Sequence, residues 1–227
     1  MACLEAMVTP ELVLVPGHAV CRTPDAPDLA ADDAWALQPY QRGEGGCYVA
    51  HIVAGVRLVA EASHRWLVFS GGRTHAAYPA LSEAESYRRV AQAQSWWGCS
   101  EAAARTLIEA FARDSYENLR FSLHCFHDTL GVRPVRVYVV GWRFKEQRFR
   151  LHAAVLGWPP ERLHYIGVND PPDLAAAQAG EAQTLQDFLA DPHGACGRLA
   201  AKRAARNPFG DTPPAHWVTT LVPPAAL

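Results

Sequence analysis

Several features that would assign this 227-residue sequence to a common class of protein are missing from it. It contains no apolar run of the ~18 residues that a membrane span requires, and its first residues lack the basic and long apolar segments of a secretory signal. The 21 Lys and Arg nearly balance the 23 Asp and Glu, which disfavours a broad nucleic-acid-binding surface. The sequence therefore predicts a cytoplasmic protein that binds neither membrane nor nucleic acid.

The common catalytic and metal signatures are also missing. There is no G-x-S-x-G elbow and no G-x-x-x-x-G-K-[ST] loop, which disfavours a serine hydrolase and a P-loop NTPase. The six scattered cysteines include no C-x-x-C pair, so we interpret them as reduced thiols. Cys47 with His51, and His124 with Cys125 and His127, are close in sequence, but no further pair completes a zinc set. We predict no metal site.

Short apolar runs alternate with amphipathic stretches along the chain. Each run ends in glycine, proline or polar residues, as is typical of buried strands in a parallel sheet. This alternation predicts an α/β fold, a three-layer Rossmann-like parallel sheet with helices on both faces. The expected strands are residues 12–15, 66–69, 135–140 and 164–168, and the expected helices are residues 48–63, 82 to about 98, 115–130 and 145–156.

We place the Rossmann-like domain at residues 10–170. Residues 171–227 form an Ala-rich C-terminal extension, which is helical in pattern from Asp173 to Arg206 and irregular after two Pro-Pro pairs. We expect this helical extension to pack on the same domain.

In open parallel sheets, ligands bind beyond the carboxyl ends of the strands. The segment Ser70, Gly71, Gly72, Arg73 and Thr74 follows one predicted strand. Paired glycines let the backbone approach a ligand, and the hydroxyls and guanidinium suit an anion. The segment predicts an anion cradle, and the alternative is an ordinary turn from strand to loop.

Further polar residues fall at the same predicted edge. Arg113, Asp114, Ser115 and Asn118 surround a helix start, where anions are favoured, although Ser115 is also explained as a helix N-cap.

A second basic group lies on the next predicted helix. Lys145, Arg148 and His152 share one face of it, and a solvated basic face is the alternative. Lys145 stands at the helix start, where a cation is unfavourable unless an anion is near. His18 ends the first strand and could transfer a proton.

Five segments in this order resemble the DUF218 family, the YdcF/SanA/ElyC-type proteins, in its intracellular eukaryotic-type branch. They are Val15–His18, Ser70–Gly72, Ser82–Ala84, Arg113–Asn118 and Lys145–Phe149, and similar tail patterns follow at Asp191–Gly194 and Lys202–Phe209.

The resemblance covers roughly Leu12 to Phe209 and implies a Rossmann-like fold with a polar pocket. It implies nucleotide-like ligands such as S-adenosylmethionine, but no defined reaction. Relatives of the cell envelope carry a membrane segment that this chain lacks. Phe144-Lys145 stands where bacterial relatives often have a histidine-containing motif, so that histidine's role is not transferred unless His152 replaces it.

The leading hypothesis is an enzyme, a hydrolase or transferase of phosphoryl groups, that acts on a small phosphorylated or nucleotide-like anion. The alternatives are a non-catalytic module that binds a nucleotide or S-adenosylmethionine, and a scaffold protein. The cofactor is left open between S-adenosylmethionine and a divalent metal, and the oligomeric state is not predicted. The candidate catalytic residues are His18, Glu83 and Asp114, and the candidate ligand-binding residues are Gly17, Ser70, Gly71, Gly72, Arg73, Thr74, Ser82, Arg113, Ser115, Asn118, Lys145, Arg148 and His152.

Overall fold

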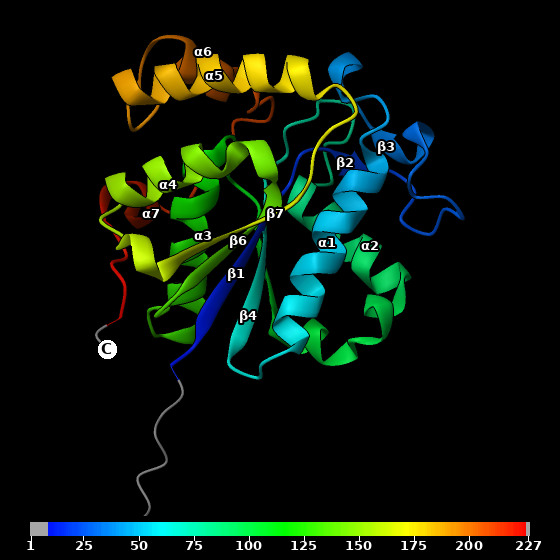
Figure 1. Cartoon of the computed structure of the whole chain (residues 1–227), viewed down its shortest axis with the longest axis horizontal. Coiled ribbons are helices and arrows are strands. Elements are labelled where there is room, and N and C mark those ends of the chain that lie inside the picture. Colours follow the sequence, from blue (N-terminus) through cyan, green and yellow to red (C-terminus); the bar gives the residue numbers. More distant parts are fainter. Residues whose placement is uncertain (1–8, 226–227) are drawn as a thin grey trace, which may run out of the picture.

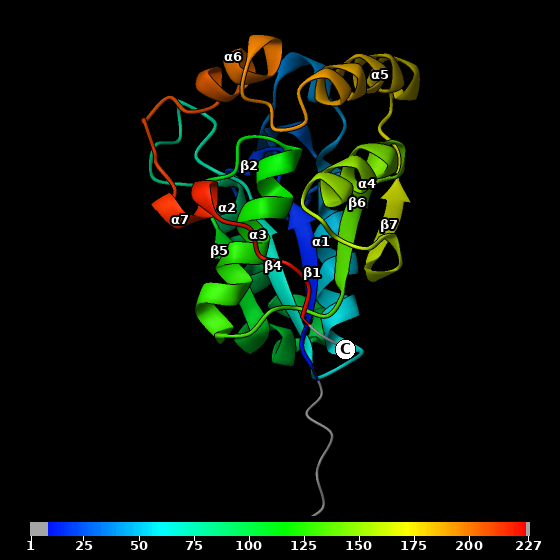
Figure 2. The ribbon, with the colours of Figure 1, turned by 90° about the vertical axis from the view of Figure 1, so that its left-hand side faces the viewer.

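The computed structural model describes residues 9–225 as a parallel sheet between two layers of helices (Figures 1 and 2). The five strands lie in the order β5-β4-β1-β6-β7, and all neighbouring pairs are parallel. The prediction of a Rossmann-like α/β fold is confirmed. The strands are β1 (Glu11–Pro16), β4 (Arg65–Ser70), β5 (Thr106–Glu109), β6 (Val137–Trp142) and β7 (Leu163–Asn169).

The central strand β1 is buried on both faces. Val13 and Val15 pack into the core beneath the first two helices, whereas Leu12 and Leu14 pack into the core on the opposite face. Successive side chains of a strand point to opposite faces, so a strand covered on both sides needs a continuous apolar sequence. This requirement explains why the apolar runs predicted the strands.

Helices α1 (Gly45–Ala60) and α2 (Glu83–Ala93) cover one face, and α3 (Ser115–Leu130) and α4 (Glu146–Val155) cover the other. Ser82 caps α2 in a capping box with Glu85. Asp114 caps α3, because its carboxylate accepts a hydrogen bond from the Glu117 amide. The prediction that Ser115 is the N-cap was wrong by one residue.

Two predicted boundaries also differ from the structure. α2 ends at Ala93 rather than near Gly98, because Ser95, Trp96 and Trp97 adopt positive φ angles of 50°, 53° and 49°. β6 begins two residues after the predicted strand start and extends to Trp142. The segment after β1 forms a small antiparallel pair, β2 (Val20–Cys21) with β3 (Trp35–Ala36).

The C-terminal extension runs back over the sheet. Helices α5 (Leu174–Ala190) and α6 (Gly197–Ala205) lie across its carboxyl edge, and α7 (Ala215–Thr219) packs beside α3 (Figures 1 and 2). Phe188 and Leu199 join the apolar core on the α3–α4 face. The sequence is helical in pattern from Asp173 to Arg206, without a predicted break. The chain instead turns between α5 and α6, where the Asp191 carboxylate accepts a hydrogen bond from the Cys196 amide at 2.8 Å.

Across residues 9–225, none of the helices combines the length and the apolar character needed to cross a bilayer.

Two helical glycines test the packing of the outer layers. A Cβ at Gly55 would lie 2.4 Å from Val15 Cγ2, so α1 can approach β1 only without a side chain there. We expect Gly55→Ala to lower the free energy of unfolding by about 1–3 kcal/mol through overpacking. Gly180 in α5 has open space around it, and Gly180→Ala should raise that free energy by about 0.5–1 kcal/mol. Urea denaturation of both variants measures the difference, and an equal effect of the two would contradict it.

Candidate functional site

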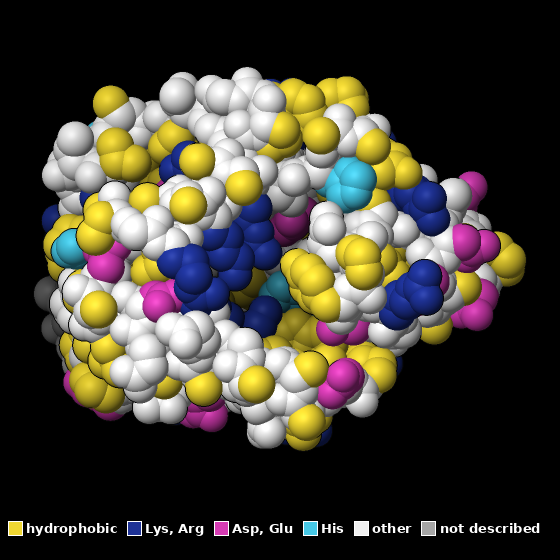
Figure 3. Space-filling view, turned by 90° about the horizontal axis from the view of Figure 1, so that it is seen from above, with side chains coloured by type: hydrophobic (Ala, Val, Ile, Leu, Met, Phe, Trp, Pro, Cys, Tyr) yellow, Lys and Arg dark blue, Asp and Glu magenta, His cyan; other side chains and the backbone are white. Residues whose placement is uncertain are grey.

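The strand order reverses at β1, because β4 lies on one side of it and β6 on the other. Such a switch point leaves a crevice outside the carboxyl ends of the two strands where no crossover helix closes the sheet. A cavity of about 490 Å³ lies there, between the strand ends and helices α5 and α6. Viewed from above, the hollow has Lys and Arg side chains gathered along one side and a histidine deeper within (Figure 3). Its volume is that of a small-molecule site.

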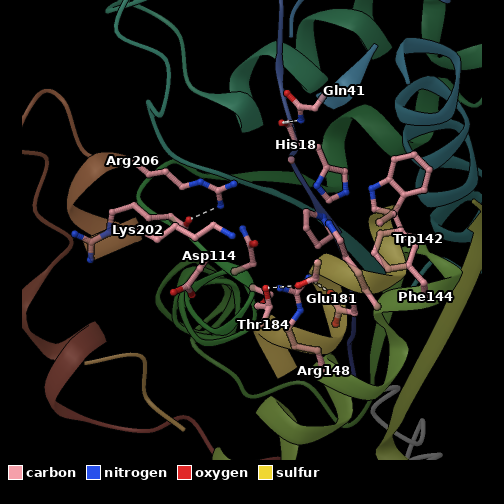
Figure 4. Close-up of a pocket in the computed structure, with 18 of the residues that line it drawn as sticks. His18, Gln41, Asp114, Trp142, Phe144, Arg148, Glu181, Thr184, Lys202 and Arg206 are labelled. Atoms are coloured by element: carbon pink, nitrogen blue, oxygen red, sulfur yellow. Dashed lines mark hydrogen bonds and ion pairs between the residues drawn. The ribbon is translucent and has the colours of Figure 1, made fainter. Parts of the chain in front are cut away.

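His18 follows β1 directly and lines this cavity. Its backbone is fixed on both sides, since its amide donates to the Tyr87 hydroxyl at 3.2 Å and its carbonyl accepts from Gln41 Nε2 at 2.8 Å. Its ring packs among aromatic rings, including Trp142 at 5.9 Å between centroids (Figure 4). Burial, followed by the charge of Lys145, holds the pKa of His18 well below its usual range, so the imidazole is neutral at pH 7. Its Nε2 atom is buried and has no hydrogen-bond partner within residues 9–225.

Glu83 lies beside His18, at the first position of α2. Two glycines make room for it: a Cβ at Gly17 would lie 2.9 Å from Glu83 Oε2, and one at Gly71 would lie 2.8 Å from the same atom. The carboxyl also accepts a hydrogen bond from the Thr74 hydroxyl. Burial raises the pKa of Glu83, which favours its protonated form.

Three cations converge on the cavity without a carboxylate partner. Lys145 follows β6. Lys202 and Arg206 come from the end of α6 (Figure 4). Arg206 donates to the Arg113 carbonyl at 2.9 Å, but none of the three forms an ion pair with a described carboxylate. Neighbouring like charges repel one another, so an anion bound between its members would stabilise such a cluster.

The pKa values of the two lysines reflect this crowding. Burial and the charge of Arg148 lower the pKa of Lys145 to about 7. Burial and the charge of Arg206 lower the pKa of Lys202 to about 8. A bound anion would raise both pKa values, because it stabilises the ammonium forms.

Several other charged residues of the cavity form ion pairs. Arg148 donates to Glu181 at 2.9 Å, and both are nearly buried. Arg113 forms an ion pair with Glu117, and Asp114 with Arg203. Glu117 offsets the charge of Arg113, which lines the cavity, and the role of Arg113 in holding an anion stays a prediction. Asp114 caps α3 and binds Arg203, which leaves it unsuited to accept a substrate proton.

The predicted anion cradle after β4 is also wrong. The Gly71 amide donates to the Glu109 carbonyl at 2.9 Å, and the Gly72 amide donates to the Ala112 carbonyl at 2.7 Å, so neither is free for a ligand. Ser70 is buried and donates to Glu109 at 2.5 Å. Arg73 lies outside the cavity, where its Nε donates to Asp211 at 2.7 Å. Gly71 is required for close packing on Glu83, and Gly72 for close packing on the backbone of Phe111 and Ala112.

The remaining predicted residues fall into two groups. Gly17, Asn118 and Ser115 line the cavity, and Asn118 also donates to Ser70 Oγ at 2.8 Å. Ser82 and His152 are fully buried and do not line it. His152 is instead hydrogen-bonded to Ser115 at 2.8 Å, so it positions a wall residue and does not contact a ligand. Thr74 lines a smaller neighbouring cavity.

Sequence reasoning missed several residues of the site. Lys202 and Arg206 are not among the predicted site residues, although the tail segment that contains them is part of the family resemblance. The aromatic wall was also missed. Trp142 is the last residue of β6 and Phe144 follows that strand, with the two rings 6.0 Å apart, so their strand-end position could have suggested a role.

The groups of possible metal ligands in the structure differ from the groups that are close together in the sequence. The structure groups His124 with Asp128 and His216, whose potential ligand atoms lie within 4.8 Å of one another. His216 Nε2 lies 2.8 Å from Asp128 Oδ2, and Trp217 donates to the same oxygen at 2.7 Å, so these contacts attach α7 to α3. Within residues 9–225, the carboxylates of Glu83, Glu109 and Asp114 do not form such a group.

No protein-family model matches the chain. The uncharacterized protein YOR238W of Saccharomyces cerevisiae is 26% identical, in an alignment that covers 90% of this chain and 86% of that protein. Its name indicates no activity, and the resemblance to the DUF218 family stays a prediction.

Glu109, beneath the site, makes the free energy of unfolding depend on pH in a way that can be tested. Burial raises its pKa to about 7, so the folded state keeps the proton up to that pH while the unfolded state loses it near 4.5. The free energy of unfolding therefore decreases as pH rises from 4.5 to 7. Glu109→Gln should remove this component, on the order of 3 kcal/mol across the window. Urea denaturation of both proteins at several pH values measures the two slopes, and equal slopes would contradict the assignment.

Proposed function

We propose that the protein is an enzyme that transfers or hydrolyses a phosphoryl group of a small phosphorylated ligand bound in the cavity at the β1–β6 switch point. The observation that carries the proposal is the convergence of Lys145, Lys202 and Arg206 without carboxylate partners among the described residues. A phosphoryl group supplies several oxygen acceptors and a compensating negative charge.

Two groups beside the cations fit the roles of base and acid. For hydrolysis, a water oxygen attacks phosphorus as the bond from phosphorus to the leaving oxygen breaks. His18 Nε2, which is neutral and has no partner among the described residues, accepts the proton of the water. Glu83, whose pKa is raised, donates its proton to the leaving oxygen. Solvent then returns the proton from His18 to Glu83.

The cavity does not fit S-adenosylmethionine well, because the positive sulfonium of that molecule would enter a site that already has a surplus of cations. Nor do the described residues gather three carboxylate or imidazole donors at the cavity, so we route no step through a metal.

A binding module without catalysis is the second candidate. The ion pair between Asp114 and Arg203 favours it, because that pair removes one of the three predicted proton carriers.

Sulfate tests the anion site, because its charge stays constant between pH 6 and 9. Lys145 is charged below pH 7 and Lys202 below pH 8, and both become neutral above those values. We expect sulfate affinity to fall on the order of tenfold from pH 6 to 9, corresponding to about 1.4 kcal/mol. Calorimetric titration measures it.

Two variants support that titration. Lys202→Gln combined with Arg206→Gln should weaken sulfate binding at least tenfold at pH 6, whereas Arg73→Gln, outside the cavity, should leave it unchanged. Binding that does not change with pH or with the double substitution would refute the anion site.

Turnover separates an enzyme from a binding module. We expect the wild-type protein to release nitrophenolate from 4-nitrophenyl phosphate or bis(4-nitrophenyl) phosphate, and His18→Asn to lower kcat by about 10²–10⁴-fold. Sulfate affinity of the variant should stay within about twofold of wild type. Absence of turnover in a wild-type protein that binds sulfate would favour the binding module.

A further inference from the structure

A second cavity, of about 290 Å³, adjoins the first on its β2–β3 side. The two cavities share part of their walls and are called the larger and the smaller chamber below. The shared residues are His18, Tyr40, Gln41, Glu83, Lys202 and Arg206.

The shared wall contains the chemically active groups. Two of the three cations without carboxylate partners, Lys202 and Arg206, border both chambers, as do His18 and Glu83. A phosphoryl group held by these cations therefore lies at the junction and not at the end of a closed pocket. Groups attached to it can extend into either chamber.

The two chambers differ in character. In the larger one, the partly exposed ring of Phe144, packed against the buried Trp142, offers a stacking surface to a planar ring. The smaller one is lined by Thr74, His75 and Gln38, whose polar side chains can bind hydroxyl groups. A ligand with one substituent would fill only one of them.

We propose, as a refinement that rests on the proposed function, that the ligand is a diester of diphosphate, with its P–O–P bridge at the junction and one organic group in each chamber. The bridge carries two negative charges, which match the two shared cations. The planar group lies in the larger chamber and the polar group in the smaller one.

Three probes test the substrate class by calorimetry at pH 7.5: inorganic diphosphate, uridine diphosphate and uridine diphosphate glucose. Uridine diphosphate carries more negative charge than its glucose ester, so electrostatics alone predicts tighter binding of the monoester. If both chambers are used, the order is reversed, and we expect the glucose ester to bind at least threefold more tightly.

A matched pair of variants locates the preference. Ala205 is exposed, lies at the end of α6 and lines the smaller chamber but not the larger one. Ala205→Trp should abolish the preference for the glucose ester and change uridine diphosphate binding less than twofold. The neighbouring Ala204 is also exposed and lines neither chamber, so Ala204→Trp should keep the preference.

The outcomes distinguish the two proposals. If inorganic diphosphate does not bind, the anion site of the proposed function fails. If it binds but the glucose ester binds no more tightly than uridine diphosphate, or if Ala205→Trp keeps the preference, the diester inference alone is overturned. A preference that Ala205→Trp removes and Ala204→Trp preserves supports it.

Discussion

The reversal of strand order at β1 is the constraint on which the site depends. β1 is central, and the chain moves outward from it twice, first to β4 and β5 and later to β6 and β7. Because the crossover helices pack on the faces of the sheet, the carboxyl ends of β1 and β6 are left without a covering connection. The residues that follow these two strands, among them His18 and Lys145, therefore face one crevice although they lie far apart in sequence.

The C-terminal extension completes that crevice. α6 supplies Lys202 and Arg206, while α5 supplies Glu181, which pairs with Arg148. Contacts with the domain hold the extension in place, including the ion pair between Arg203 and Asp114. The extension thus brings cations into the site and also removes Asp114 from the chemistry. The charge balance of the site depends on both effects.

Much of the framework could be predicted from local pattern. The apolar run of β1 predicts a strand buried on both faces, and the Ser82–Glu85 spacing predicts a helix start. Site prediction was less successful. Gly71 and Gly72 have the composition of an anion-binding loop, but their amides donate hydrogen bonds to the carbonyl groups of Glu109 and Ala112. Sequence spacing does not indicate which distant carbonyl group accepts the hydrogen bond of a given backbone amide.

By itself, the sequence determined four of the five strands of the parallel sheet, helices α1 to α4 in outline and the strand-end position of His18. These features follow from periodicity and from residues adjacent in the chain. Only the tertiary structure decided which charged side chains of the cavity lack an ion-pair partner and can therefore bind a ligand. Asp114 is neutralised by Arg203, which lies 89 residues further along the chain, whereas Lys202 and Arg206 are brought together at the cavity without a carboxylate partner in the described chain. Electrostatic pairing depends on distances between folded segments, and those distances arise only when α6 packs over the ends of β1 and β6.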